Sequence, residues 1–210
     1  MDIDCGRLDA DRAYKLLVNL VVPRPIAWVT TLGRGDVVNA APFSVFNMVG
    51  EDPPLVMISV NKLPGGRFKD TARNILDRQQ FVVHIADEAC TVAMDITASE
   101  LPPEQSETVL AGLHCSPSRC VAPPRITEAP VAFECTLWET LESASRYVFF
   151  GRILWLHARE GLIDTDNWRI RYEHFRPVGR FGAGQYVRLQ DRFVVHEGRC
   201  RDIQAPGAEG

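Results

Sequence analysis

Short apolar runs bounded by turn residues dominate the hydrophobic pattern of this chain, and such runs predict β-strands. In Val131–Trp138 apolar residues alternate with smaller or polar ones, as in a strand with one buried face. Tyr147–His157 is longer and almost continuously apolar, which predicts a strand buried on both faces. Further strands are predicted at Ile26–Leu32, Val37–Phe46, Leu55–Val60 and Phe81–Ala86.

Helical periodicity is confined to a few short segments. Phe68, Ala72 and Ile75 recur at spacings of four and three, which places them on one face of a helix. A Pro-Pro pair at 102–103 comes just before the segment Glu104–Ala111, and proline in this position is typical of a helix start. The predicted helices are Asp9–Leu20, the segment around 68–76, Cys90–Ala98 and Glu104–Ala111.

The order of these elements predicts a single, mainly β domain. Strands follow one another with few intervening helices, and neither the βαβ alternation nor the GxGxxG of a Rossmann fold occurs in the sequence. Such a series favours a closed antiparallel barrel, because closure removes exposed sheet edges. No repeat or low-complexity linker divides the chain, so we expect one domain over residues 1–197. A polar, Gly/Pro-rich and flexible tail is expected over 198–210.

Composition and charge narrow the class of protein. The formal net charge is −4, which argues against nucleic acid or an anionic membrane as the main partner. No apolar run approaches the roughly 20 residues that a membrane helix needs. The first 15 residues also lack the basic and apolar regions of a signal peptide. We therefore expect a cytoplasmic protein.

The cysteines and histidines do not suggest a metal site. Six cysteines occur without a CxxC motif or a zinc-like Cys/His spacing, and the five histidines are dispersed. Cys90 and Cys135 lie in apolar segments and are expected in the core. Cys115 and Cys120 close a short loop, but a reducing cytosol disfavours a disulfide between them.

The stretch Arg24–Phe46 (RPIAWVTTLGRGDVVNAAPFSVF) carries the first chemical signal. Its strand-like runs cluster small and hydroxyl-bearing side chains where most strands place bulky apolar ones. A strand loses packing in this way unless something flat with polar edges lies against its backbone, and a bound cofactor fits that description. The residues concerned are Thr30, Thr31, Asn39, Ala40, Ala41 and Ser44.

A second segment, Ser59–Asn74 (SVNKLPGGRFKDTARN), has the composition of a phosphate site. A double glycine lets backbone N–H groups face a ligand, and the start of the following helix favours an anion. Arg67 and Lys69 would add charge-assisted hydrogen bonds. The alternative is a solvated helix start beside an ordinary loop, and spacing alone does not separate the two.

Five motifs in order, RPIAWVTT, NAAPFSVF, DPPLVMISV, GGRFKDTARNI and FVVHIAD, resemble the flavin reductase-like family of FMN-binding split barrels. APVAFECTLWE, YVFFGRILWLHA and FRPVGRFGAGQYVRL are similar to the later strands of that family, so the resemblance spans residues 14–189. It implies a mainly β, antiparallel, Greek-key split barrel with a few flanking helices. It also implies bound FMN and a homodimer with the cofactor near the subunit interface.

The resemblance further implies which side chains contact FMN. One group would hold the phosphate, a second would meet the ribityl chain or the phosphate, and a third would line the isoalloxazine ring. For the two aromatic residues that could stack on the ring, simple core packing is the alternative. In that order the residues are Arg67, Lys69 and Thr71; Thr30 and Thr31; Asn39, Ala40, Ala41 and Ser44; and Phe46 and Trp28.

The implied activity is that of an NAD(P)H-dependent flavin reductase, which passes hydride from the nicotinamide to flavin. Reduced flavin or electrons would then reach a partner such as a monooxygenase. Because the flavin supplies the chemistry, no acid–base residue is required. His84 is a weak catalytic candidate, with a hydrogen-bonded strand histidine as its alternative. A flavoredoxin-like FMN electron carrier and a non-redox, small-ligand-binding dimer stay open as alternative functions.

The late segment GRFGAGQY has two interpretations. Arg180, Gly182, Gly184 and Tyr186 could cover the flavin or the dimer partner. Alternatively, the segment is a Gly-rich connection that lets the last strand bend. The sequence does not choose between them.

Overall fold

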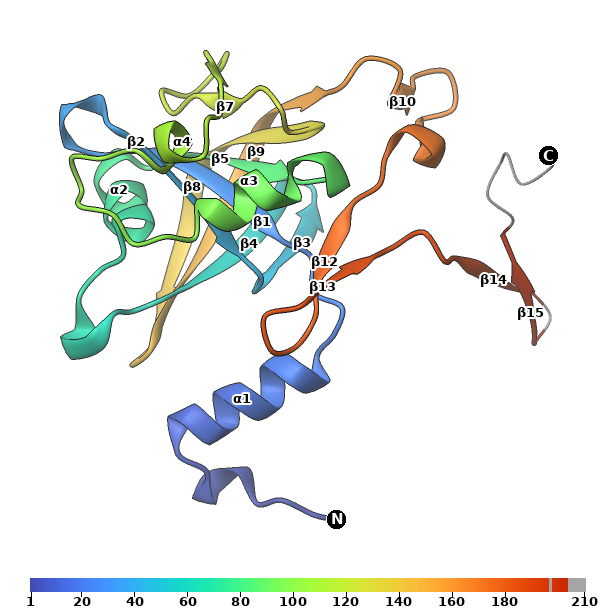
Figure 1. Ribbon diagram of the computed structural model, residues 1–210, viewed down its shortest axis with the longest axis horizontal. Helices are drawn as coiled ribbons and strands as arrows, with labels where there is room; N and C mark the ends of the chain where they lie inside the picture. Colours follow the sequence, from blue (N-terminus) through green and yellow to red (C-terminus); the bar gives the residue numbers. More distant parts are fainter. Residues whose placement is uncertain (197, 204–210) are drawn as a thin grey trace.

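A computed structural model describes residues 1–196 and 198–203 of the chain, and its centre is one curled sheet (Figure 1). The seven strands follow the order β2-β1-β5-β8-β9-β4-β3, and every neighbouring pair is antiparallel. The mainly β, antiparallel architecture is therefore confirmed. The strands are β1 (Ala27–Leu32), β2 (Val38–Phe43), β3 (Phe46–Glu51), β4 (Pro54–Asn61), β5 (Gln80–Ile85), β8 (Val131–Glu142) and β9 (Arg146–Ala158).

The two edge strands of this sheet are consecutive in the chain, because β2 leads directly into β3. The chain turns at Ser44 and Val45, and the Ser59 N–H donates a hydrogen bond to the Val45 carbonyl at 2.8 Å. This bond ties the corner to β4. The sequence pattern predicted one strand over Val37–Phe46, which is wrong at its end because the strand breaks at this corner. It also missed β3.

Four α-helices and five short 3-10 helices surround the sheet in the described part of the chain. Helix α1 begins after Asp9, whose carboxylate accepts the Arg12 N–H at 2.8 Å, and none of its residues is buried. Helix α4 is shorter than predicted, because the Gln105 N–H bonds to the Pro102 carbonyl in a turn. The helices are α1 (Ala10–Leu20), α2 (Asp70–Arg78), α3 (Thr91–Ile96), α4 (Glu107–Leu110), η1 (Cys5–Arg7), η2 (Arg34–Asp36), η3 (Pro64–Gly66), η4 (Glu88–Cys90) and η5 (Tyr172–His174).

Strand β9 is buried along only part of its length. Strand β4 pairs with β9 from Arg146 to Arg152, and beyond that point β9 has only β8 as a neighbour among the described strands. The side chains of Leu154, Trp155 and Leu156 are correspondingly exposed. The prediction that this strand is buried on both faces is therefore wrong for its second half.

The remaining strands form four two-stranded ribbons outside the main sheet. The predicted tail over 198–210 falls partly within the last of them, because residues 199–202 pair with β14. Residues 204–210 lie outside the described residues, so flexibility of the tail stays a prediction. The ribbons are β6 (Cys115–Ser116) with β7 (Arg125–Ile126), β10 (Ile163–Asp164) with β11 (Arg169–Ile170), β12 (Val178–Arg180) with β13 (Tyr186–Arg188), and β14 (Phe193–His196) with β15 (Arg199–Asp202).

Candidate functional site

A groove of about 430 Å³ lies between β2, the start of α2 and the segment 97–107. Its volume is within the range of small-molecule sites. Five of the eleven residues that the sequence proposed as cofactor contacts line it, although they come from separate segments of the chain. They are Asn39, Ala41, Arg67, Lys69 and Thr71.

The cationic end of the groove is shaped by the turn before α2. Gly65 and Gly66 both have φ of 75°, a left-handed conformation that favours glycine. The turn brings Arg67 to the surface, where its Nε bonds to the Pro64 carbonyl at 3.4 Å. Lys69 precedes the first residue of α2, and its side chain does not cap the helix. The N-terminal N–H groups of α2 and two cations therefore share one end of the groove, which suits an anion.

A buried hydrogen-bond network joins α2 to the sheet behind the groove. Asn39 Nδ2 donates to Thr31 Oγ1 at 3.2 Å and to Thr71 Oγ1 at 2.9 Å, and Asn74 Nδ2 donates to Thr31 Oγ1 at 3.0 Å. All four side chains are buried. Thr71 thus accepts from Asn39 and retains its own O–H as a donor, while Thr31 lies behind the groove rather than in it.

The free edge of β2 is capped by side chains from the segment that precedes and begins α4. Ser106 Oγ donates to the Val38 carbonyl at 2.6 Å, and Glu107 Oε2 accepts the Ala40 N–H at 3.0 Å. Burial raises the pKa of Glu107 despite this hydrogen bond. Glu107 also lines the main groove and a neighbouring cavity of about 340 Å³ around Gly33, Arg34 and Arg73.

The other predicted contacts are not brought into this groove. Ala40 has no exposed surface and packs with Trp28, whose Nε1 donates to Thr97 Oγ1 at 2.9 Å in the core. Phe46 is likewise a core residue, so the structure favours core packing for both aromatic candidates. Ser44 lines a separate cavity beside α1.

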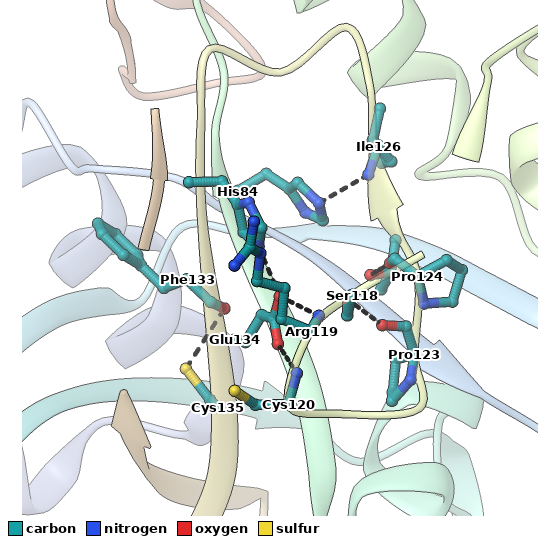
Figure 2. A network of polar contacts seen from close by, with 12 residues as sticks. His84, Ser118, Arg119, Cys120, Pro123, Pro124, Ile126, Phe133, Glu134 and Cys135 are labelled. Carbon is teal, nitrogen blue, oxygen red and sulfur yellow. Dashed lines mark hydrogen bonds and ion pairs between the residues drawn. The ribbon is translucent and has the colours of Figure 1, made fainter. Parts of the chain in front are cut away.

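Thr30 and His84 face the opposite side of the sheet and hold the loop over residues 117–126. Figure 2 shows His84 beside Ile126 of this loop. The Thr30 hydroxyl donates to the Pro124 carbonyl at 2.6 Å. His84 Nε2 accepts the Ile126 N–H at 2.8 Å, and its Nδ1 lies 2.8 Å from the Trp28 carbonyl, to which it donates as the neutral tautomer. Both ring nitrogens of His84 are thus occupied, and the strand-histidine alternative is the one that the geometry supports.

Glu134 of β8 fixes the same loop from a fully buried position (Figure 2). It accepts the N–H groups of Arg119 and Cys120 at 2.7 and 2.6 Å and lies 2.5 Å from His157 Nε2. Burial alone would raise the pKa of Glu134, but these hydrogen bonds hold it below its ordinary value. Thr30, His84 and Glu134 therefore form a structural network on the face away from the groove.

Two residues of the groove region were missed by sequence reasoning. Asn74 follows Thr71 by three positions on α2, and its polarity on a buried helix face was a usable signal. Glu107 had no such signal, because it reaches Ala40 from 67 residues along the chain.

Neither a metal cluster nor a membrane-spanning helix occurs in the described part of the chain. Among residues 1–196 and 198–203, no group of three or more His, Cys, Asp or Glu side chains is placed to hold a metal ion. Cys115 and Cys120 are both free and exposed. None of the described helices has the length and apolar character needed to cross a membrane.

Comparison with known proteins gives a consistent family match. The sequence model described as "Flavin reductase like domain" matches residues 19–176. An uncharacterized Aquifex aeolicus protein is 43% identical over 188 residues, covering 90% of this chain and 95% of that protein. An uncharacterized Bacillus subtilis protein is 41% identical over 195 residues, covering 90% and 95%.

Solved structures extend this similarity to the fold. Component B of nitrilotriacetate monooxygenase from Bacillus cereus superposes with a TM-score of 0.87 at 34% identity, covering 93% of this chain and 98% of that one. A 2-nitrobenzoate 2-nitroreductase from Pseudomonas fluorescens gives a TM-score of 0.85 at 40% identity, covering 93% and 95%. Flavoredoxin of Desulfovibrio vulgaris shares the fold, with a TM-score of 0.73 at 20% identity, covering 94% and 97%.

The buried position of His84 predicts a specific loss of stability in acid. Burial lowers its pKa from 6.5 to about 4, so the stability it contributes is present above pH 6.5 and is lost as the pH falls toward 4. The loss should be about 3 kcal/mol, since a tenfold difference in proton affinity between the folded and unfolded states is worth about 1.4 kcal/mol. Urea unfolding of the wild type, His84→Gln and the exposed control His174→Gln between pH 7 and 4 measures it. Only His84→Gln should flatten the pH dependence, and an unchanged slope in that variant would contradict the assignment.

Proposed function

The chain belongs to the flavin reductase-like family, and we propose that it is an FMN-binding, NAD(P)H-dependent flavin reductase that supplies reduced flavin or electrons to a partner. Family membership makes the protein a flavin-related oxidoreductase. The choice of FMN, the nicotinamide donor and delivery to a partner are the proposal. The observation that carries it is the groove beside α2, which combines the small side chain of Ala41 on β2 with two cations at a helix start.

The residues present fit a phosphorylated, flat cofactor. Arg67 and Lys69 would bind the phosphate together with the first N–H groups of α2, and Thr71 would donate its remaining O–H. Arg73 is already paired with Asp70 at 2.8 Å, so it offers less charge to a ligand. Ala41 would let a ring approach the backbone of β2. The chemistry that FMN supplies when bound is acceptance of a hydride and transfer of the electrons onward.

The protein's own contribution is positional. The network of Asn39, Thr31 and Thr71 holds the start of α2 against β2. It thereby sets the distance between the two cations before α2 and the small side chain of Ala41 on β2. The Glu107 bond to Ala40 holds the start of α4 at the free edge of β2, which forms one side of the groove. Neither role requires a proton-transferring side chain.

A homodimer is part of the same proposal. Helix α1 buries none of its residues and presents Tyr14, Leu17 and Leu20 to the surface, while β9 exposes Trp155 beyond its pairing with β4. Large apolar side chains exposed together on one helix support an interface at α1. Light scattering after size-exclusion chromatography should give twice the mass of the 23.5 kDa chain, and Leu17→Glu with Leu20→Glu should shift the mass toward the monomer. A monomeric wild-type protein would contradict the proposed homodimer.

The phosphate assignment predicts a loss of FMN affinity on removal of the two cations. The double substitution Arg67→Ala with Lys69→Ala should weaken binding by about 2–5 kcal/mol, taking about 1–3 kcal/mol for each charge-assisted hydrogen bond. Titration of the protein with FMN, followed by flavin fluorescence, gives the dissociation constant. The matched control is Arg169→Ala with Arg171→Ala, which removes the same charge near β11. Equal effects of the two double variants would place the phosphate elsewhere.

Turnover separates the proposed reductase from its alternatives. Purified protein with FMN should oxidise NADH or NADPH, measured as the loss of reduced-nicotinamide absorbance. The double variant Arg67→Ala with Lys69→Ala should need a higher FMN concentration to reach the same rate. A flavin-loaded protein that is reduced only by a protein donor would instead support the flavoredoxin-like carrier. A folded protein without affinity for FMN would leave the non-redox binding role.

A second candidate activity is reduction of a nitroaromatic acid. The observation in its favour is the 40% identity, over 93% of this chain, to the 2-nitrobenzoate 2-nitroreductase. The same assay tests it when 2-nitrobenzoate is added. A rate of NAD(P)H oxidation that rises with 2-nitrobenzoate at saturating FMN favours the nitroreductase, and an unchanged rate favours the flavin reductase.

A further inference from the structure

We propose that the cavity between α1, the β12–β13 turn and the end of β2 is a binding site for a small aromatic carboxylate. The cavity measures about 370 Å³ and adjoins the candidate flavin groove, since Ala98 lines both. The inference does not rest on the proposed reductase activity, because the binding is measured directly. The residues that carry it are Tyr14, Lys15, Arg24, Arg180, Phe181 and Tyr186.

The wall of the cavity is built by close contact between the turn and α1. A Cβ atom at Gly182 would lie 2.0 Å from Asn19 Oδ1, so a larger residue would have to displace the exposed Asn19 side chain of α1. The turn continues through Ala183 and Gly184 at φ of 52° and 83°. The Phe181 N–H then donates to the Gln185 carbonyl at 2.8 Å and closes the turn. The Gly-rich segment therefore forms one side of a cavity as well as connecting two strands.

Arg24 is a buried cation at the inner end of this cavity. Only 8% of the residue is exposed. Its Nε bonds to Ser44 Oγ at 3.4 Å, and its Nη1 donates to the Val21 carbonyl at 2.8 Å and to the Val18 carbonyl. The Val18 and Val21 carbonyls lie at the C-terminal end of α1 and carry its partial negative charge, but no carboxylate forms an ion pair with Arg24 in the described part of the chain. The helix end offsets part of the charge of Arg24, and an anionic ligand would supply the full counter-charge that a buried cation favours.

Arg180 adds a second cation in a fixed position. Its guanidinium lies 4.6 Å from the centre of the Tyr186 ring, and its Nη1 is 3.9 Å from Asp95 Oδ1. The Tyr186 hydroxyl donates to the same Asp95 oxygen at 2.5 Å. Asp95 is the one carboxylate among the described lining residues, against the three cations Arg24, Arg180 and Lys15. Lys15 is paired with Asp11 at 2.7 Å, so the two arginines supply most of the positive charge.

The residues that line the cavity carry a net positive charge, whereas the whole protein has a net negative charge. The chain carries a net charge of −4, yet its cationic side chains outnumber the carboxylate in this cavity. A cavity lined by one sign of charge concentrates ligands of the opposite sign. The ligand is therefore an anion.

Aromatic side chains determine the rest of the ligand. Tyr14, Phe181 and Tyr186 line the cavity beside the arginines. Rings prefer flat partners in stacked or edge-on arrangements, and guanidinium groups bind carboxylates through paired hydrogen bonds. An aromatic ring carrying a carboxylate satisfies both sets of groups, and its size suits this volume.

Isothermal titration of the full-length protein with benzoate tests the site. Benzoate should bind, and benzyl alcohol, which has a similar ring but no charge, should bind at least 10-fold more weakly. Arg180→Gln should weaken benzoate binding at least 10-fold, and the backbone bonds of Arg180 to Arg24 do not depend on that side chain. Lys15→Gln, on exposed helix α1, should weaken it about 2–5-fold without affecting the barrel.

The control variant is Arg67→Gln, which removes a cation from the flavin groove and should leave benzoate binding unchanged. Absence of benzoate binding to a folded protein would overturn the proposal, as would equal binding of benzyl alcohol. Equal weakening by Arg67→Gln and Arg180→Gln would assign benzoate to the flavin groove and also overturn it. If NADPH binds in an Arg180-dependent manner and benzoate does not, the cavity is a dinucleotide site and the aromatic carboxylate is excluded. Failure of FMN to bind would affect the proposed reductase and not this result.

Discussion

The buried amide of Asn39 is the interaction on which the candidate site depends. One side chain from β2 donates to Thr31 on β1 and to Thr71 on α2, so two strands and a helix meet at a single amide group. A buried amide that lost one of these acceptors would leave a polar group unsatisfied, which costs about 1–3 kcal/mol. The network therefore fixes the start of α2, and with it the two cations, relative to the small residues of β2. The site is a consequence of how a helix is bonded to a sheet.

The two faces of the sheet divide the polar residues of the central strands between two tasks. On one face, Asn39 and Thr31 hold α2 beside the groove. On the other, Thr30, His84 and Glu134 hold the loop over residues 117–126 by accepting or donating backbone hydrogen bonds. The second set has the composition of a functional cluster, but its polar atoms are used within the protein. What distinguishes the groove is that Arg67 and Lys69 reach its surface and Thr71 keeps a donor.

The groove and the cavity beside α1 meet at Ala98, and each offers cations to a ligand within an acidic protein. Across the whole groove three carboxylates balance three cations, and only its end at the start of α2 is cationic. In the groove the charge comes from a helix start, where backbone N–H groups add to it. In the cavity it comes from a buried arginine whose described partners are all neutral. The two sites thus suit different anions, a phosphate on an extended cofactor and a compact carboxylate on a ring.

The sequence by itself determined the fold class, the positions of most helices and strands, and the family. These features follow from hydrophobic periodicity and from short motifs, both of which are formed by residues close together in the sequence. It also indicated the cationic helix start, because Gly65, Gly66, Arg67 and Lys69 are neighbours in the chain. The tertiary structure alone decided which of the hydroxyl and small residues face the groove. Thr30 and Thr31 are adjacent in sequence, yet successive residues of a strand point to opposite faces, and only the packing of α2 and of the 117–126 loop shows which face is which. The same holds for Glu107 and Arg24, whose surroundings are assembled from segments far apart in the chain.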